Sequence, residues 1–353
     1  MNRTATPPRN ILIVRLGAMG DIVMASGLIP SLREIWPEAR LAWLADEPNA
    51  DLLRHNPRLD RLHLWPRRRW RELRQTRQYR RLIREMAEFI RGLRAERYDL
   101  VLDLQGLLKS GVWAYASGGQ RRIGLGSREG SRILMTEVLD RHVDSPKIGK
   151  EYRKLAEYLG ASPDSFALDI AVGGEDRARA AELIRSLGLD GDYAVIAPFT
   201  TRPQKHWFDE RWAELADRLR VERGWPVLML GGPGDRERAA ALRGLAGDGL
   251  IDLAGQTTLG LCAALIERAR VLIGVDTGLT HLGIAQQVPT LALFGSTRPY
   301  LDPGAATARV LYQALDCSPC RRRPTCGGAY DCMRLHSADS VLAALARLPE
   351  KQP

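Results

Sequence analysis

The stretch ILIVRLGAMGD, residues 11–21, decides the fold class of this chain. A short apolar run is followed by a turn that contains two glycines, and the turn opens a helical pattern. Glycine at such a corner lets the backbone turn tightly and approach a ligand closely. A strand, a glycine turn and a helix in this order predict the start of a βαβ unit.

The same alternation of short apolar runs and helical patterns recurs along both halves of the chain. The expected strands are Ile11–Leu16, Leu41–Ala45, Leu62–Trp65, Leu100–Leu104, Arg122–Leu125, Tyr193–Ala197, Pro226–Leu230, Leu250–Leu253, Val271–Val275 and Thr290–Phe294. The expected helices are Ile22–Ile35, Trp70–Ala95, Asp209–Glu222, Arg236–Leu245 and Leu259–Arg268. Strands that read as near-continuous apolar runs are typical of parallel sheets covered by helices on both faces.

The chain length favours two domains. It has 353 residues, and single hydrophobic cores stop growing near ~250–300 residues. Turn and linker residues gather at 160–175, so we expect an N-terminal domain over 1–165 and a C-terminal domain over 166–353. Each would be a Rossmann-like, doubly wound α/β domain, and the two would face a central cleft at the carboxyl ends of their strands.

The composition is that of a globular protein, with 45% apolar and 27% charged residues. No apolar run approaches the ~20 residues that span a bilayer. The first ten residues lack the apolar region of a secretory signal. We therefore expect a soluble, cytoplasmic protein.

Positive charge is concentrated in one segment. The chain carries a net charge of +10, and residues 67–97 hold twelve Arg and four Glu, which leaves +8 in that segment. Such an excess indicates an anionic partner: a nucleic acid, a phospholipid surface or an acidic small molecule. The alternative is a solvated Arg-rich helix.

Polar residues follow several of the expected strands. Hydroxyls and a lysine in TTRPQKHW, residues 200–207, suit phosphate capture. GVDTGLTH, residues 274–281, opens a helix whose first N–H groups favour an anion. DLQGLLKS, residues 103–110, offers Gln105 and Lys109 to a polar ligand. Asp21 has two interpretations, a helix N-cap or a general base.

Four cysteines, Cys317, Cys320, Cys326 and Cys332, fall within the segment 317–332. Four thiols in this spacing are candidate ligands of a tetrahedral structural metal, zinc or iron. Reduced thiols and disulfides are the alternatives. Cys262 lies alone in an apolar helix and is expected in the core.

Taken in order, these motifs resemble the ADP-heptose:lipopolysaccharide heptosyltransferases of glycosyltransferase family 9. The resemblance covers nearly the whole chain and rests on residues 11–21, 103–110, 200–207 and 276–281, followed by the FGST run at 294–297. It implies the GT-B architecture, with 1–165 binding the acceptor and 166–353 the nucleotide-sugar donor. It also implies an inverting reaction that needs no catalytic metal or other cofactor.

The resemblance assigns roles to individual residues. Asp21 matches the catalytic base, and Lys205 matches the lysine that binds the donor phosphates. The donor contacts it implies are Gly20, Thr200, Thr201, Lys205, Asp235, Asp276, Thr277, Gly278 and His281. The family often carries a Glu near residues 231–234, and the nearest candidates for it here are Asp235 and Glu237. The acceptor contacts are Arg68, Arg69, Arg71, Gln105 and Lys109, with the arginines facing an acidic Kdo sugar.

The predicted reaction is transfer of a heptose from ADP-heptose to the Kdo or heptose of the lipopolysaccharide inner core. The expected partners are ADP-heptose, a lipid A–Kdo or heptosylated acceptor and, by peripheral contact, the inner membrane surface; no nucleic acid is expected. One alternative is a GT-B transferase or epimerase with a UDP or GDP donor. Another is a nucleic-acid-binding protein with a cysteine metal knuckle.

Overall fold

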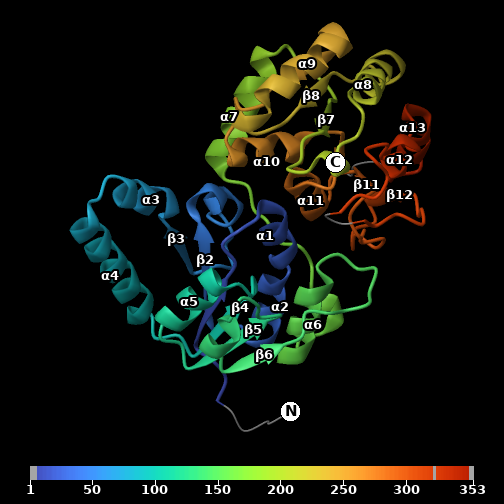
Figure 1. Cartoon of the computed structure of the whole chain (residues 1–353). Coiled ribbons are helices and arrows are strands. Elements are labelled where there is room, and N and C mark those ends of the chain that lie inside the picture. Colours follow the sequence, from blue (N-terminus) through green and yellow to red (C-terminus); the bar gives the residue numbers. More distant parts are fainter. Residues whose placement is uncertain (1–5, 321–322, 350–353) are drawn as a thin grey trace. The chain divides into compact units, whose positions relative to one another are not determined.

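The computed structural model describes residues 6–320 and 323–349, so Arg321 and Arg322 of the cysteine-rich segment lie outside the described residues. The chain divides into two compact units. Unit 1 comprises Met1–Asp144 and Gly149–Ala171, and unit 2 comprises Ser145–Ile148 and Val172–Pro353. Each is built around a six-stranded sheet (Figure 1).

The sheet of unit 1 has the strand order β3-β2-β1-β4-β5-β6, with every neighbouring pair parallel. Its strands are β1 (Asn10–Val14), β2 (Arg40–Asp46), β3 (Arg61–Trp65), β4 (Leu100–Asp103), β5 (Arg121–Leu125) and β6 (Glu137–Leu139). This is the doubly wound order, in which the chain changes its direction of travel across the sheet between β1 and β4. Ligands of such sheets bind beside this switch point, at the carboxyl ends of the strands.

Helices cover both faces of this sheet (Figure 1). They are α1 (Met19–Ala25), α2 (Leu28–Ile35), α3 (Arg67–Gln75), α4 (Tyr79–Ala95), α5 (Leu108–Ala116) and α6 (Lys150–Leu159). On one face, α3, α4 and α5 pack against the strands through Trp70, Leu93 and Trp113. The rings of Trp70, Phe89 and Trp113 contact one another in this core.

Unit 2 repeats the same topology. Its order is β12-β11-β10-β7-β8-β9, again all parallel, with the switch point between β7 and β10. Its strands are β7 (Ala194–Ala197), β8 (Val227–Met229), β9 (Leu250–Asp252), β10 (Val271–Val275), β11 (Thr290–Phe294) and β12 (Ala308–Tyr312).

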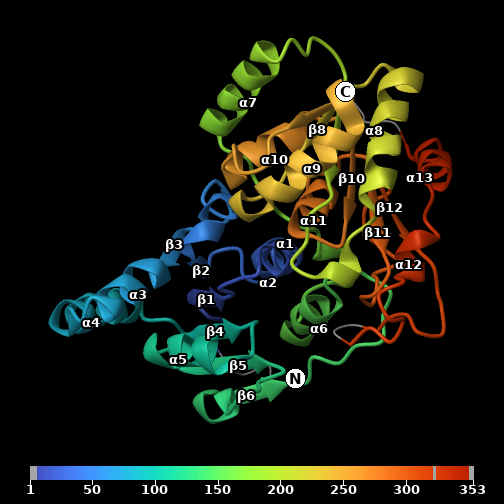
Figure 2. The same cartoon turned by 45° about the horizontal axis from the view of Figure 1, so that its top comes forward.

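The helices of unit 2 also lie on two faces, which the turned view separates (Figure 2). They are α7 (Gly174–Ser186), α8 (Asp209–Arg223), α9 (Arg236–Ala246), α10 (Leu259–Arg268), α11 (Gly278–Ala285), α12 (Asp331–Arg334) and α13 (Ala338–Leu345). The core on one face includes Trp212 of α8, Leu242 of α9 and Val341 of α13. Gly274 of β10 is needed for packing, because a Cβ there would lie 2.2 Å from Oγ1 of Thr280.

The fold class predicted from the sequence is confirmed, and the differences lie in single elements. The helix expected over Trp70–Ala95 is two helices, because Arg77 adopts a left-handed conformation with φ of 57°. The helix expected over Ile22–Ile35 is likewise divided into α1 and α2. Each sheet has one strand more than predicted, β6 and β12. No helix in the described part of the chain is long and apolar enough to cross a membrane.

Candidate active site

The predicted site residues of each unit follow the strands that flank its switch point. In unit 1, Arg15 to Asp21 follow β1, and Leu104 to Lys109 follow β4. In unit 2, Thr200 to Lys205 follow β7, and Asp276 to His281 follow β10. Because ligands of doubly wound sheets bind at this position, each unit has a candidate site of its own there.

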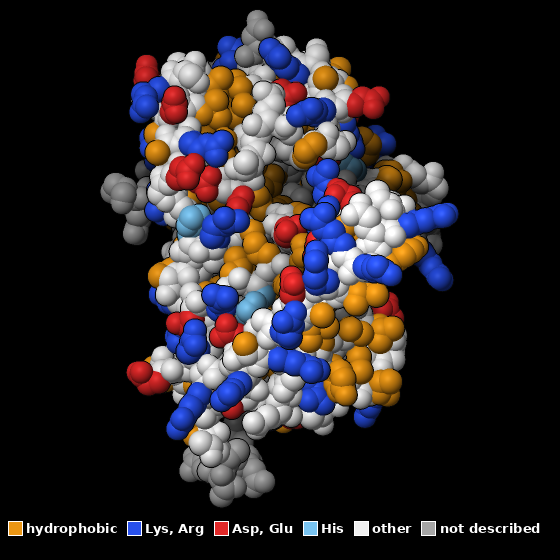
Figure 3. All heavy atoms as spheres, turned by 90° about the vertical axis from the view of Figure 1, so that its left-hand side faces the viewer, with side chains coloured by type: hydrophobic (Ala, Val, Ile, Leu, Met, Phe, Trp, Pro, Cys, Tyr) orange, Lys and Arg blue, Asp and Glu red, His pale blue; other side chains and the backbone are white. Residues whose placement is uncertain are grey.

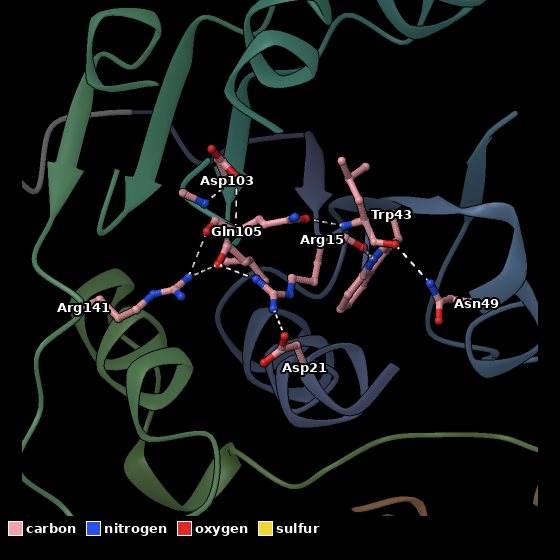
Figure 4. A network of polar contacts seen from close by, with 10 residues as sticks. Arg15, Asp21, Trp43, Asn49, Asp103, Gln105 and Arg141 are labelled. Atoms are coloured by element: carbon pink, nitrogen blue, oxygen red, sulfur yellow. Dashed lines mark hydrogen bonds and ion pairs between the residues drawn. The ribbon is translucent and has the colours of Figure 1, made fainter. Parts of the chain in front are cut away.

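Asp21 is held by a buried arginine in unit 1. The N-cap of α1 is Ala18, so Asp21 lies in the first helical turn and is not the cap. Its Oδ2 contacts the Arg15 guanidinium, which is buried, while the Asp21 side chain is 38% exposed (Figure 4). Burial alone would lower the pKa of Arg15, but neighbouring Tyr152 and Asp21 raise it. Arg15 therefore stays charged and fixes one oxygen of a solvent-accessible carboxylate.

Backbone groups of the β1 and β4 corners surround this pair (Figure 4). Arg15 donates to the carbonyl oxygen of Leu104 at 3.3 Å, and Arg141 donates to the same oxygen. The side-chain oxygen of Gln105 accepts from the Leu16 N–H at 3.1 Å. Gln105, predicted as an acceptor contact, thus ties the two corners together.

Asp103 shapes the turn after β4. Its Oδ1 accepts from the N–H groups of Gln105 and Gly106, both at 3.1 Å. Burial raises the pKa of Asp103, although these hydrogen bonds and that of Ser110 act in the opposite direction. The turn fixes where α5 begins and so where Lys109, an exposed side chain, leaves the helix.

The predicted acceptor arginines lie on α3. Arg68 is paired with Glu72 at 3.1 Å, and Arg69 with Glu85 of α4 at 3.5 Å. Arg71 is exposed. All three belong to unit 1, in the Arg-rich pair of helices α3 and α4.

Lys205 and Asp276 form an ion pair in unit 2. The Lys205 ammonium lies 2.6 Å from Oδ2 of Asp276 and donates to its carbonyl oxygen at 2.9 Å. Thr297 donates to the same Oδ2 at 2.6 Å. Burial would raise the pKa of Asp276, but hydrogen bonding by His281 and the charge of Lys205 hold it well below its usual value. The carboxylate is therefore ionised at neutral pH.

His281 completes this cluster. Its Nε2 lies 3.5 Å from Oδ1 of Asp276, and its Nδ1 lies 2.8 Å from the Tyr300 hydroxyl. Burial and the charge of Asp276 raise the pKa of Tyr300 far above its ordinary value, so the hydroxyl keeps its proton. A hydroxyl that donates to Nδ1 places the imidazole proton on Nε2, facing the carboxylate.

The other predicted donor contacts belong to unit 2, except for Gly20. Thr277 caps α11 with its backbone, and Gly278 is the first residue of that helix. Thr200 and Thr201 lie in the loop between β7 and the 3-10 helix η4 (Pro203–Lys205). Asp235 accepts from the N–H of Gly232 at 2.8 Å and so caps its own turn. Gly20 is the second residue of α1 in unit 1.

None of the four clustered cysteines forms a disulfide. Cys317 is exposed, Cys320 and Cys326 are half-buried, and Cys332 is buried. Burial raises the pKa of Cys332, and the charges of the other three sulfurs raise it further. Within residues 6–320 and 323–349, however, no three His, Cys, Asp or Glu side chains are arranged to hold a metal ion. As the side chains stand, they do not fit a metal centre.

Sequence reasoning missed the residues that hold the predicted ones in place. Arg15 stands in the quoted motif, but nothing in a single sequence indicates that it contacts Asp21. Thr297 and Tyr300 follow β11, a strand next to β10, and the polar residues after that strand were the available signal. Arg141 has no such signal, because it lies in an irregular segment after β6.

Comparisons with known proteins give a consistent result. The profile of "Glycosyltransferase family 9 (heptosyltransferase)" matches residues 86–330. Lipopolysaccharide heptosyltransferase 1 of Pseudomonas aeruginosa is 32% identical over 90% of this chain and 87% of its own. A glycosyl transferase family 9 structure from Veillonella parvula has a TM-score of 0.79 and 25% identity, with 96% of each chain covered. The Escherichia coli heptosyltransferase WaaC with ADP-2-deoxy-2-fluoro heptose has a TM-score of 0.68 and 25% identity, covering 96% of this chain and 99% of its own.

Proposed function

Because the chain belongs to glycosyltransferase family 9, the heptosyltransferase family, we propose that it moves a heptose from ADP-heptose to the Kdo or heptose of the lipopolysaccharide inner core. The observation that carries the assignment of roles is the position of Asp21 and Lys205. Each stands at the switch point of its own sheet, next to a partner of opposite charge. Unit 1 then binds the acceptor, and unit 2 binds the donor.

In this proposal Asp21 is the general base. Arg15 engages Oδ2, which leaves Oδ1 for the acceptor hydroxyl. As the acceptor oxygen bonds to the anomeric carbon, its proton passes to Asp21, and the bond from that carbon to the phosphate oxygen breaks. A single displacement of this kind inverts the anomeric centre. General base catalysis contributes about 10²–10⁴-fold to the rate.

Unit 2 stabilises the charge that develops on the leaving ADP. The Lys205 ammonium and the N–H groups at the start of α11 are cationic or dipolar donors beside one strand pair. The hydroxyls of Thr200 and Thr201 belong to the same corner as Lys205. Asp276 repels a phosphate, so its role in the proposal is to position Lys205 and His281.

In this proposal the acceptor is anionic and lipid-linked, so the Arg-rich helices α3 and α4 have a ligand of opposite charge. Arg68, Arg69 and Arg71 would face the acidic sugar, together with Lys109. The same positive charge favours contact with anionic phospholipids, so we place the reaction at the cytoplasmic surface of the inner membrane. No cofactor is proposed for catalysis.

For the cysteines, we propose that the cluster at Cys317, Cys320, Cys326 and Cys332 takes up zinc or iron after a local rearrangement. The support is the presence of four cysteines within sixteen residues of the sequence, because four thiolates are a ligand set that zinc and iron accept. A bound metal would crosslink a segment otherwise poor in regular structure. Elemental analysis of the purified protein, with Cys326→Ser as the comparison, should give close to one metal per chain and a loss in the variant.

The decisive experiment on the function is Asp21→Asn. Turnover of ADP-heptose with a Kdo-bearing lipid acceptor should fall about 10²–10⁴-fold, while ADP affinity by calorimetry stays unchanged. Asp164→Asn is the matched control, because Asp164 is an exposed carboxylate of the same unit in the 3-10 helix η3 (Pro163–Ser165). Near-normal turnover of Asp21→Asn would refute the assignment.

The choice of nucleotide is tested separately. ADP should raise the thermal midpoint of the protein more than UDP or GDP, because at equal concentration the ligand that binds more tightly stabilises the folded state more. A larger shift with UDP or GDP would favour another GT-B transferase or an epimerase.

A further inference from the structure

We infer that an exposed apolar face on α5 and the neighbouring 3-10 helix η2 (Ser131–Leu134) inserts into the surface of an anionic phospholipid bilayer. This inference rests on the proposed function, because it states how an enzyme with a lipid-linked acceptor holds the membrane. It goes beyond the charge of the α3–α4 segment, because it assigns apolar contact to a different pair of elements. We call this face the α5–η2 face, and it consists of Leu108, Val112, Tyr115 and Ile133.

The apolar character of the α5–η2 face is unusual for a surface. Leu108, Val112 and Tyr115 have the spacing i, i+4 and i+7, so they share one side of α5, and they are 44–54% exposed. Ile133 on η2, which contacts α5, is 85% exposed. Single exposed apolar residues are ordinary, but a contiguous group indicates an interaction site. Figure 3 shows hydrophobic side chains gathered on one face and bordered by Lys and Arg side chains.

An open hollow lies next to these side chains. It measures about 590 Å³, and its wall includes Trp65, Leu108, Val112 and Trp113. Lys109 and Glu129 are the charged residues at its edge. An apolar depression of this kind accepts the acyl part of a lipid, while a lysine at the edge suits the headgroup phosphate.

The cations around the α5–η2 face indicate which kind of partner binds there. Lys109, Arg128 and Arg132 are exposed, and within the described residues they make no ion pair. The guanidinium of Arg122 lies over the Tyr115 ring, 5.3 Å from its centroid. Tyrosine and arginine together are typical of the zone between lipid headgroups and acyl chains. An apolar surface edged by cations has the chemistry of an interfacial membrane contact.

The neighbouring helix adds further positive charge to unit 1. Helix α4 contacts α5 and carries Arg80, Arg84 and Arg91 at spacings that place them on one side, with Ile83 66% exposed beside them. These arginines also make no ion pair within the described residues. Two copies of such a face would bring like charges together, whereas anionic lipids neutralise them. Complementarity of charge therefore favours a bilayer over a second copy of the chain.

Flotation of the full chain with vesicles tests the inference. The probe is large vesicles of phosphatidylethanolamine with about 30% phosphatidylglycerol, in the range of anionic membranes, compared with vesicles of phosphatidylcholine alone. The variant is Val112→Ser with Ile133→Ser, which removes apolar contact and keeps the charge. The matched control is Val221→Ser with Leu245→Ser, two residues of unit 2 that are 65% and 57% exposed.

The original protein should bind to the anionic vesicles. In the α5–η2 variant this binding should fall about tenfold or more, because two aliphatic side chains no longer enter the lipid. The control pair should bind within about twofold of the original protein. Part of the binding should also survive at high salt, since apolar insertion is not screened. Equal binding of both variants, or binding that salt abolishes completely, would overturn the inference.

Two further measurements separate this inference from the proposed function. Turnover with a deacylated, water-soluble acceptor should be the same in the original protein and in the α5–η2 variant, because neither Val112 nor Ile133 is among the residues proposed to bind the acceptor sugar. If turnover is absent altogether, the proposed function fails whatever the vesicles show. If the original protein self-associates, floats with neither vesicle, and becomes monomeric in the variant, the α5–η2 face binds a second copy and the inference is wrong.

Discussion

Arg15 is the residue on which the position of Asp21 depends. It is buried, it contacts one carboxylate oxygen, and it is anchored on the Leu104 carbonyl. That carbonyl also accepts from Arg141, so it retains a partner if Arg15 is replaced. The catalytic consequence of losing Arg15 can therefore be separated from damage to the β4 corner.

We predict that Arg15→Met lowers kcat about 10- to 100-fold with little change in the KM for ADP-heptose, and that Arg15→Lys recovers part of the loss. The split between kcat and KM is the readout, because a general disturbance of the site would raise the KM as well. Equal losses in Arg15→Met and Arg15→Lys, or a rise in the KM that accounts for the loss, would assign Arg15 a structural role only.

Lys205 offers a similar test on the donor side. Lys205→Met should weaken ADP binding about 10- to 100-fold in calorimetry, as expected for a charge-assisted phosphate contact. It also leaves the Asp276 carboxylate without its cation, and breaking a largely buried pair costs about 3–5 kcal/mol.

A double variant distinguishes the two effects. Lys205→Met with Asp276→Asn removes the unpaired charge, so the thermal midpoint should recover while ADP affinity stays low. Recovery of affinity together with stability would mean that Lys205 acts through the fold and not on the phosphates.

At the level of elements, the strands at the centre of each sheet were predictable, whereas one edge strand of each sheet, β6 and β12, was missed. β4, β7 and β10 are buried along their whole length, and β1 is buried from Ile11 to Val14. Continuous burial requires a continuous apolar run. The edge strand β6 is only half-buried and begins with Glu137. β12 is also mostly half-buried and includes Arg309. Polar residues interrupt the pattern there without preventing backbone pairing.

The break between α3 and α4 was missed for a related reason. Residues 76–78 contain neither Gly nor Pro, and Arg77 is the residue that adopts the left-handed conformation. The apolar periodicity continues on both sides because both helices contribute to the same core, α3 through Trp70 and α4 through Leu93. Apolar periodicity therefore indicates which side of a helix faces the sheet, but it does not show that the helix axis changes direction.

His63 on β3 predicts an acid-sensitive contact within unit 1. Its Nε2 lies 2.8 Å from the hydroxyl of Tyr98, a residue that precedes β4 in the chain. Burial, and then the charge of Arg61, lower the pKa of His63 from 6.5 to about 4. The folded state thus favours the neutral ring, so its contribution is complete above pH 6.5 and is lost as the pH falls toward 4.

The measurement is the free energy of unfolding of the original protein and of His63→Gln across this pH range. The original protein should lose roughly 2 kcal/mol more than the variant between pH 7 and pH 4. Parallel curves for the two proteins would show that His63 titrates as in the unfolded chain.

For the whole molecule, the two units share one strand order, and this repetition explains how much of the site was visible beforehand. Each motif could be placed after a strand, and parallel strands bring their carboxyl ends to one edge, so Asp21 and Lys205 could be selected. The pairing of Lys205 with Asp276 spans 71 positions in the chain. Nothing in the spacing fixes such a contact, because it depends on the parallel pairing of β7 with β10. The same holds for Gln105 and Leu16, which are 89 positions apart.

Amide hydrogen exchange with and without ADP tests, across the whole chain, which unit binds the nucleotide and which binds the acceptor. If unit 2 holds the nucleotide, saturating ADP should slow exchange at residues 199–205 and 276–281, around the β7 and β10 corners. At 100 times its Kd, a ligand stabilises the folded state by about 2.7 kcal/mol, which corresponds to roughly 100-fold slower exchange where opening releases the ligand. Residues 104–109 of unit 1, and residues 15–21 other than the predicted donor contact Gly20, should exchange as in the free protein, and a deacylated acceptor should give the reverse pattern. Protection by ADP at the β1 corner and not at β7 would reverse the roles of the two units, because the diphosphate would then lie beside Arg15.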